Sequence, residues 1–174
     1  ERLVTSLLAL DLAETSTTSP EEFSLTSLIN DSFGDLAQLS ERPVELDLQD
    51  VSMTGTEEGW AQLLANLAQN ISRYTPTDAP VAVRLRHTVV HGESWFTLTV
   101  DDGGPGIPIH NRETIFDRFT RLDKARDSAS GGFGLGMSII KSVVVAHQGE
   151  LALDDSPLGG LRVEISAPTR PRQP

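Results

Sequence analysis

The sequence contains no cysteine, which excludes a disulfide framework, a zinc ribbon and a cysteine nucleophile. It also has no apolar run close to the ~18 residues that a membrane-spanning helix needs. Basic residues are few, because 14 Lys and Arg stand against 25 Asp and Glu, which gives a formal net charge of -11. This charge repels nucleic acid and anionic lipid, so we expect no nucleic-acid partner and no membrane contact by this chain. A small anionic ligand stays compatible with it, because backbone N–H groups and a few cations can bind such a ligand.

The 174 residues fall within the range of a single domain with short flanking segments. Residues 1–20 combine a leucine-rich helical stretch with a polar linker that ends in a Ser-Pro turn. We expect the folded domain over 21–167 and a disordered, frayed tail over 168–174. The chain opens on Glu1 without a signal segment, which favours a fragment excised from a longer chain.

Along 21–167 the apolar residues follow helical and strand periodicities in turn. A spacing of about 3.6 residues predicts helices, and alternation with a period of about two predicts strands. The turn at 91–93 lies between two apolar strands and predicts a hairpin. Helices are expected over 26–39, 57–72, 109–119 and 135–147, and strands over 23–25, 44–48, 81–85, 95–100 and near Leu151 and Val163. We predict an α+β fold, an α/β two-layer sandwich in which a mixed, largely antiparallel sheet of about five strands is covered on one face by about three helices.

Four polar or aromatic residues share one stripe of the helix that begins at 57. Asn70 lies four residues after Asn66, three before Arg73 and four before Tyr74, so one helix face carries all of them. An Asn side-chain oxygen suits Mg²⁺, a cation at Arg73 can reach a phosphate, and the Tyr74 ring can cover a base. An ordinary solvated helix face gives the same spacing, so the pattern alone leaves both interpretations open.

A glycine-rich turn at 102–107 directly follows an apolar strand. Asp102 therefore stands at a strand end, where its carboxylate can accept a hydrogen bond from an exocyclic amine. Gly104 and Gly106 leave room for a flat ring to approach the main chain, because neither residue has a Cβ atom. Taken alone, this segment is equally compatible with a simple tight turn.

A second glycine-rich segment, with Gly132, Gly134 and Gly136, enters an apolar helix. A helix N-terminus binds anions, because unpaired N–H groups and the helix dipole point toward the ligand. The segment is not a dinucleotide or protein-kinase loop, since the G-x-G-x-x-G pattern breaks at 137 and 139, and no P-loop motif occurs in the chain.

The polar segment at 121–130 lies upstream of these glycines and contains Lys124 and Arg126 but only one large apolar residue. We expect it to form a mobile loop that can fold over phosphates. An exposed linker without a ligand would have the same composition, so this interpretation also stays open.

Taken in order, these segments resemble the nucleotide-binding boxes of sensor histidine kinases, members of the ATPase superfamily that includes gyrase and Hsp90. Residues 63–76 are similar to the N box, 102–106 to the G1 box, 115–121 to the F box and 132–136 to the G2 box. Each motif is weak alone, whereas all of them in this order form a specific signal. The resemblance covers about 21–167, and it identifies 1–20 as the end of a dimerisation helix with its linker.

The resemblance implies a site for ATP and Mg²⁺. Asn70 would bind the metal, Asn66 would lie beside the metal and the phosphates, and these two are the implied catalytic positions. Asp102 would bond the adenine amine, while Phe116 and Phe119 would anchor a mobile ATP lid. The full set of implied ATP-binding residues is Asn66, Asn70, Arg73, Tyr74, Asp102, Gly104, Gly106, Ile107, Phe116, Phe119, Lys124, Arg126, Gly132, Gly134, Leu135 and Gly136.

The resemblance also implies a function, the transfer of the ATP γ-phosphoryl group to a histidine, for relay to an aspartate of a response regulator. The partners would be the dimerisation and phosphoacceptor domain of the same kinase, homodimeric in the full-length protein, and the response regulator. The domain would be cytoplasmic and its parent an inner or plasma membrane sensor. The histidines at 87, 91, 110 and 147 lack the surroundings of the family's phosphoacceptor motif. We therefore expect a histidine protein kinase fragment that does not autophosphorylate alone.

Other functions stay open. A superfamily ATPase would carry a Glu four residues before the metal-binding Asn as a general base, but Asn66 occupies that position here, so we expect slow hydrolysis. A serine kinase acting on an anti-anti-sigma factor is less favoured, because of the helical stub at 1–20 and the F box. A degenerate protein-contact domain is disfavoured by the intact Asn70, Asp102 and glycine loops.

Overall fold

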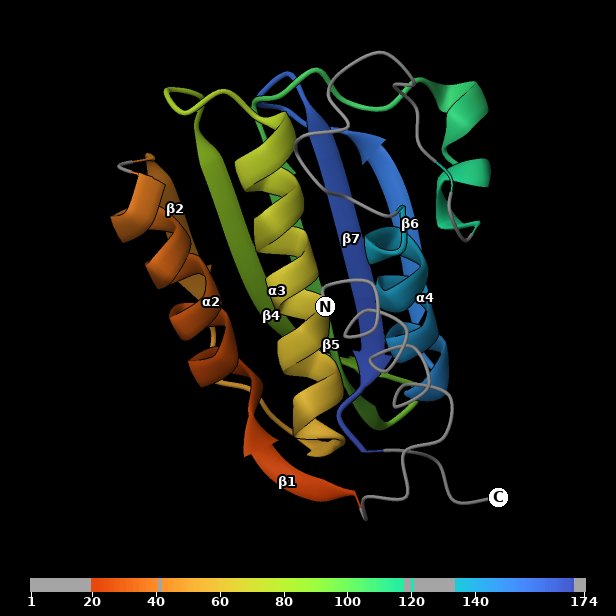
Figure 1. Cartoon of the computed structure of the whole chain (residues 1–174). Helices are drawn as coiled ribbons and strands as arrows, with labels where there is room; N and C mark the ends of the chain where they lie inside the picture. The colour runs from red at the N-terminus through yellow and green to blue at the C-terminus, as the bar shows by residue number, and fades with distance from the viewer. Residues whose placement is uncertain (1–19, 41, 118–119, 121–133, 171–174) are drawn as a thin grey trace.

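The computed structural model describes residues 20–40, 42–117, 120 and 134–170, and Figure 1 shows a sheet with helices packed on it. The main sheet has five strands in the order β2-β4-β5-β7-β6. β2 runs parallel to β4, and the other neighbouring strands are antiparallel. The strands are β2 (Val44–Leu48), β4 (Val81–Val90), β5 (Glu93–Asp102), β6 (Glu150–Asp155) and β7 (Leu161–Pro168). The mixed, largely antiparallel sheet predicted from the sequence is confirmed.

Helices α2 (Leu25–Ser40), α3 (Glu57–Tyr74) and α4 (Gly136–Ala146) cover one face of this sheet, with α3 between the other two (Figure 1). The apolar stripe of α3 is buried against the strands, and its largest member, Trp60, meets the Phe96 ring edge-on at a centroid distance of 5.4 Å. Burial of this stripe holds α3 at the centre of the molecule. The polar residues of its C-terminal half are thereby placed beside α4 and the end of β5.

A second sheet joins β1 (Glu21–Ser24) to β3 (Ser52–Gly55) and has two strands. The sequence predicted a strand near 23–25 but none at 52–55. The segment Ser52–Gly55 lacks an apolar alternation, and it forms a strand because β1 pairs with it, with Phe23 opposite Met53. Tertiary pairing, rather than local propensity, therefore makes this strand.

The helix predicted over 109–119 is wrong within the described residues. Two short 3-10 turns replace it, at Ile109–Asn111 and Thr114–Phe116. The Thr114 hydroxyl donates to the Asn111 carbonyl at 3.2 Å, and the Arg112 guanidinium donates to the Ile107 carbonyl at 3.0 Å. These side chains thus donate hydrogen bonds to backbone carbonyls in the region where a regular helix was expected. Such competition with the backbone hydrogen bonds interrupts a helix.

The folded chain also extends past the boundary predicted at 167. β7 includes Pro168, and the buried Thr169 donates its N–H to the Ser94 carbonyl at 2.9 Å and accepts from the Thr54 N–H at 2.7 Å. These bonds tie the end of the chain to β5 and β3. Residues 171–174, like the segment 1–19 assigned to a helix end and linker, lie outside the described residues. In the described part of the chain, no helix has the length and apolar content needed to cross a bilayer.

The four histidines lie in a strand, a hairpin turn, a 3-10 turn and at a helix end. His87 lies in β4, His91 in the β4–β5 turn with φ 50°, and His110 in the first 3-10 turn. His147 follows α4 and is buried, with its Nε2 accepting a hydrogen bond from the Thr56 N–H at 3.1 Å. Burial lowers the pKa of the His147 imidazole below its ordinary value of 6.5.

Candidate functional site

Asn66 and Asn70 lie on the side of α3 that faces the start of α4. A Cβ atom placed on Gly136 would lie 3.2 Å from Asn66 Oδ1 and 3.6 Å from Asn70 Oδ1. Both amide oxygens therefore converge on the first residue of α4. The predicted stripe on α3 and the second glycine-rich segment meet at this point.

Hydrogen bonds of the amide nitrogens hold these oxygens in place. Asn66 is buried, and its Nδ2 donates to the Gln62 carbonyl at 2.8 Å. Asn70 is half-buried, and its Nδ2 donates to the Met137 sulfur at 3.4 Å. Within the described ranges no donor contacts either oxygen, so both can ligate a hard cation.

Arg73 and Tyr74 form the last turn of α3. The Arg73 guanidinium carbon lies 5.8 Å from the centroid of the Tyr74 ring, and Tyr74 is 54% exposed. The ring is open to solvent, so a flat ligand has access to it. The guanidinium is half-buried at the same end of the helix.

Asp102 is the last residue of β5, and its carboxylate is held through one oxygen. Oδ1 accepts from the Gly104 N–H at 2.7 Å, and the Leu161 N–H lies 3.4 Å from the same atom. Among the described residues nothing donates to Oδ2. The carboxylate is therefore fixed in orientation while one oxygen can accept a hydrogen bond from a ligand amine.

Gly160 is a residue of this site that the sequence interpretation missed. Its N–H donates to the Asp102 carbonyl at 3.1 Å, and a Cβ atom on it would lie 2.3 Å from Asp102 Oδ1 and 2.4 Å from the Gly104 nitrogen. No side chain fits in that space, so glycine is required by close packing. In the sequence, the Gly159-Gly160 pair predicts a turn between two strands. The pair does not indicate that this turn reaches Asp102.

The β6–β7 turn that carries Gly160 is fixed by its own hydrogen bonds. The Ser156 N–H donates to the Gly160 carbonyl at 2.9 Å, and the Ser156 hydroxyl accepts from the Leu158 N–H at 3.0 Å. Gly106, another predicted site residue, packs against the same turn, since a Cβ atom on it would lie 3.2 Å from the Gly160 carbonyl oxygen. The β6–β7 turn thus packs against both Asp102 and Gly106.

The remaining predicted residues lie just before α4, in the segment after β5, or outside the described residues. Leu135 is buried just before α4, and Gly134 precedes it with φ 71°. Ile107 is half-buried, and its carbonyl accepts from Arg112. The described ranges do not include Phe119, Lys124, Arg126 and Gly132, nor the expected lid at 121–130.

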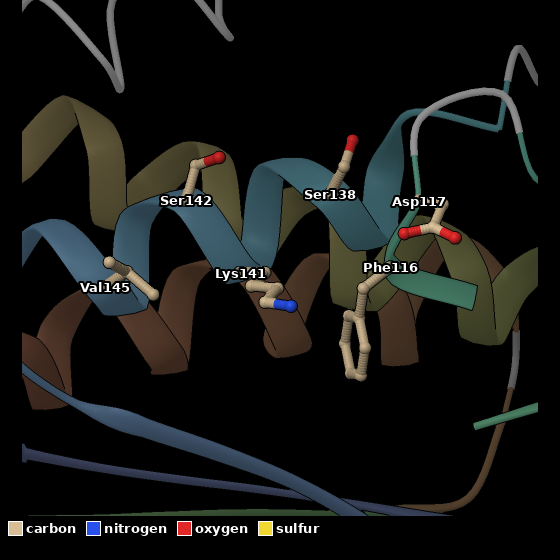
Figure 2. A pocket seen from close by; sticks show the side chains of 6 residues that line it. All are labelled: Phe116, Asp117, Ser138, Lys141, Ser142 and Val145. Atoms are coloured by element: carbon tan, nitrogen blue, oxygen red, sulfur yellow. The ribbon is translucent and has the colours of Figure 1, made fainter. Parts of the chain in front are cut away.

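Phe116 lies in the second 3-10 turn, which packs against α4. Figure 2 shows its ring beside Lys141, whose Nζ lies 5.4 Å from the ring centroid, a cation–π contact. They line a pocket of about 320 Å³ together with Asp117, Ser138, Ser142 and Val145. None of the amide and carboxylate groups described above lines this pocket, so it is a separate feature.

The chain matches the family model described as Histidine kinase-, DNA gyrase B-, and HSP90-like ATPase over residues 55–171. The sensor histidine kinase CpxA of Escherichia coli is 40% identical over 114 residues, which are 66% of this chain and 24% of CpxA. The signal transduction histidine-protein kinase/phosphatase MprB of Mycolicibacterium smegmatis is 32% identical over 160 residues, 91% of this chain and 31% of MprB. This chain thus spans about a quarter to a third of the length of these relatives.

A solved structure gives the same result. The mycobacterial sensor histidine kinase MprB aligns with a TM-score of 0.75 and 28% identity, covering 88% of this chain and 99% of that chain. All four nucleotide-binding boxes inferred from the sequence fall inside the matched region. The chain therefore belongs to the family of histidine kinase-, DNA gyrase B- and HSP90-like ATPases, and within that family it is similar to sensor histidine kinases.

Proposed function

We propose that this chain binds Mg-ATP and donates the γ-phosphoryl group to a histidine on the dimerisation domain of the same sensor histidine kinase, for relay to an aspartate of a response regulator. The observation that carries the proposal is the convergence of the Asn66 and Asn70 amide oxygens on the first residue of α4, in a chain whose Asp102 carboxylate keeps one oxygen available. This arrangement supplies a ligand for a cation, a helix N-terminus for an anion and an acceptor for an amine.

Each part of an adenine nucleotide has a counterpart among these residues. Asp102 Oδ2 would accept the hydrogen bond of the adenine amine, and the half-exposed Tyr74 ring would cover the base or ribose. The N-terminus of α4, at Gly136, would face the phosphates, since its unpaired N–H groups and helix dipole attract negative charge. Arg73 would add a positive charge to an acidic domain.

The asparagine pair fits Mg²⁺, because Asn70 offers a hard oxygen ligand and Mg²⁺ takes its remaining ligands from water and phosphate. Bound there, the metal would neutralise phosphate charge during transfer. Asn66 is an amide and cannot act as a general base for water at neutral pH. Phosphoryl transfer by positioning of the reactants, with slow hydrolysis, therefore suits this chain better than the hydrolysis performed by a clamp ATPase. The similarity to the sensor kinases CpxA and MprB supports the same choice.

The phosphoacceptor histidine would come from another domain. His147 is buried, and His87, His91 and His110 are distributed over a strand, a turn and a 3-10 turn. In the full-length protein the acceptor would belong to the homodimeric dimerisation domain, and a cytoplasmic response regulator would receive the phosphoryl group. The parent protein would be a sensor kinase, as CpxA and MprB are named sensor and signal transduction kinases, and its proposed place is the inner or plasma membrane.

Calorimetric titration with a non-hydrolysable ATP analogue, with and without Mg²⁺, tests this proposal. Asp102→Asn replaces the acceptor oxygen by an amide, and we expect a dissociation constant weaker by about 5- to 150-fold, equivalent to one buried hydrogen bond. Asp35→Asn on α2 makes the same chemical change at an exposed position and should leave binding unchanged. A folded wild type that ignores the analogue at millimolar concentration would refute the proposal.

A second measurement addresses the transferred group. Incubation of the chain with γ-labelled ATP should leave it unlabelled, because the described histidines do not form a phosphoacceptor motif. Label on the isolated chain would contradict the proposed division between this domain and the acceptor domain.

A further inference from the structure

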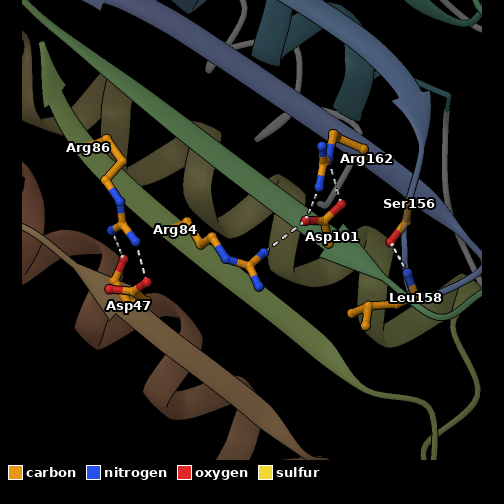
Figure 3. A network of polar contacts seen from close by, with 7 residues as sticks. All are labelled: Asp47, Arg84, Arg86, Asp101, Ser156, Leu158 and Arg162. Atoms are coloured by element: carbon orange, nitrogen blue, oxygen red, sulfur yellow. Dashed lines mark hydrogen bonds and ion pairs between the residues drawn. The ribbon is translucent and has the colours of Figure 1, made fainter.

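Asp101, the residue before Asp102, carries a carboxylate that is completely buried on the sheet face opposite the helices. Figure 3 shows two arginines covering it. Arg162 binds both oxygens, Nε to Oδ1 at 2.8 Å and Nη2 to Oδ2 at 2.9 Å, and Arg84 Nη1 contacts Oδ2 at 3.2 Å. These hydrogen bonds raise the pKa of the Arg162 guanidinium above its ordinary value. The group therefore joins β4, β5 and β7 through charge-assisted bonds.

Stability alone does not account for a buried ion pair. Removing the Asp101 carboxylate from water costs about as much as its attraction to the partly exposed arginines returns, and apolar residues of similar volume are often as stable. What a bidentate guanidinium does provide is directional constraint, because its planar fork fixes the partner carboxylate in distance and in angle.

The segment that contains Arg162 also contacts Asp102, on the other face of the sheet. Asp101 pairs with Arg162 in the antiparallel register of β5 and β7. Just before Arg162 in the chain, the Gly160 N–H donates to the Asp102 carbonyl at 3.1 Å and the Leu161 N–H lies 3.4 Å from Asp102 Oδ1. Residues 160–162 thus contact residues 101–102 on both faces at once.

We propose that Asp101 and Arg162 are positioning residues for adenine recognition, and that their bidentate ion pair holds the β6–β7 turn against Asp102. This inference rests on the proposed function. A shift of β7 along β5 would move Gly160, which bonds the Asp102 backbone carbonyl, and Leu161, whose N–H lies 3.4 Å from Asp102 Oδ1. Recognition by a directional hydrogen bond is sensitive to displacements well below 1 Å, so loss of the ion pair should weaken the contact to the base amine.

A second ion pair on the same sheet face serves as a matched control. Arg86 of β4 pairs with Asp47 of β2, and the side chains are 42% and 54% exposed. This pair contacts neither β7 nor the β6–β7 turn in the described structure, and exposed pairs contribute little. Asp47→Asn therefore removes the same type of group from the same face without touching Asp102.

The test compares two ligands, a non-hydrolysable ATP analogue and its counterpart that lacks the 6-amino group of the base. In the wild type the ratio of their dissociation constants should be about 5 to 150, since only the first ligand makes the amine hydrogen bond. We expect Asp101→Asn and Arg162→Lys each to reduce this ratio at least about threefold, while binding of the counterpart without the amine changes less than about twofold. Asp47→Asn should keep the wild-type ratio.

A merely structural role would weaken both ligands equally and leave the ratio unchanged, and that result would overturn the inference. Arg162→Lys keeps the charge of a partly exposed side chain, so it decides the matter if Asp101→Asn does not fold. A wild type that binds neither ligand would refute the proposed function itself. If the wild type binds both ligands with the expected ratio of dissociation constants and the variants keep that ratio, only the positioning role is refuted.

Discussion

Gly160 lies so close to Asp102 that a single Cβ atom on it would come within 2.3 Å of the Asp102 carboxylate oxygen Oδ1. The two residues are 58 positions apart, on a turn and at a strand end, and the backbone bond from the Gly160 N–H to the Asp102 carbonyl joins them at 3.1 Å. The proposed adenine acceptor therefore depends on a glycine that belongs to none of the motifs recognised in the sequence.

Gly160→Ala should weaken nucleotide binding at least about tenfold and destabilise the fold by about 1–3 kcal/mol, because the added methyl group meets the Gly104 backbone nitrogen as well as Asp102. Calorimetry and urea denaturation would measure the two effects. Gly34→Ala is the control, since Gly34 lies within α2 with no atom within 4 Å of its added Cβ. That variant should bind normally and be stabilised by up to about 1 kcal/mol. Equal nucleotide affinities for Gly160→Ala and the wild type would disprove the close-packing argument.

Asn70→Ala should abolish most of the Mg²⁺ dependence of nucleotide binding while leaving metal-free binding nearly unchanged. The physical reason is that the Asn70 oxygen is the expected protein ligand of the metal, whereas the base contacts lie at Asp102. Titrations with Mg²⁺ and with a chelator would separate the two conditions. Gln69→Ala, at the exposed neighbouring position, should behave as the wild type. Persistent Mg²⁺ dependence in Asn70→Ala would remove Asn70 from the metal site.

The sequence identified most residues of the candidate site because each motif is local. Asn66 and Asn70 share a helix face because of their spacing alone. The position of Asp102 at a strand end follows from the residues within ten positions of it in the sequence. Gly160 and Arg162 were not predicted, because their contacts arise from the antiparallel register of β7 with β5. A register between distant strands cannot be read from periodicity, which specifies only which face a side chain occupies.

Local signals were also insufficient where side chains compete with the backbone. The apolar spacing over 109–119 predicted a helix, but hydrogen bonds from Arg112 and Thr114 to nearby carbonyls accompany short 3-10 turns instead. β3 shows the opposite case, since four residues without a strand pattern form a strand because β1 lies beside them. In the first region local side-chain hydrogen bonds oppose the helical periodicity, and in the second a tertiary pairing supplies a strand that the periodicity does not indicate.

Asn66→Glu should raise the rate of ATP hydrolysis at least about tenfold, because a carboxylate at this position can take a proton from water and general-base catalysis contributes about 10²–10⁴-fold. The Asn66 oxygen already faces the start of α4, where the phosphates are proposed to lie. Phosphate release assays would give the turnover. Asn66→Gln has the same length as the Glu variant but no basic group, so it separates chemistry from packing. If Asn66→Glu hydrolyses ATP no faster than the wild type, the explanation for slow hydrolysis is wrong.

His147 should make the stability of the domain depend on pH. Its Nε2 accepts from the Thr56 N–H at 3.1 Å, and its Nδ1 lies 2.8 Å from the Val143 carbonyl, so the neutral ring with a proton on Nδ1 satisfies both contacts. Protonation of Nε2 would break the bond to the residue that precedes α3. Because burial lowers the folded-state pKa below 6.5, the unfolded chain takes up the proton first on acidification.

The stabilisation by neutral His147 is therefore fully present above pH 6.5 and is lost as the pH falls from that value through the lower folded-state pKa. Urea denaturation at pH 8 and at pH 5.5 would measure this loss. His147→Gln keeps a side-chain acceptor for the Thr56 N–H but cannot titrate, so its stability should fall less between these pH values than that of the wild type. His110→Gln, at an exposed position, should retain the wild-type pH dependence. If His147→Gln loses as much stability as the wild type, other groups cause the acid sensitivity.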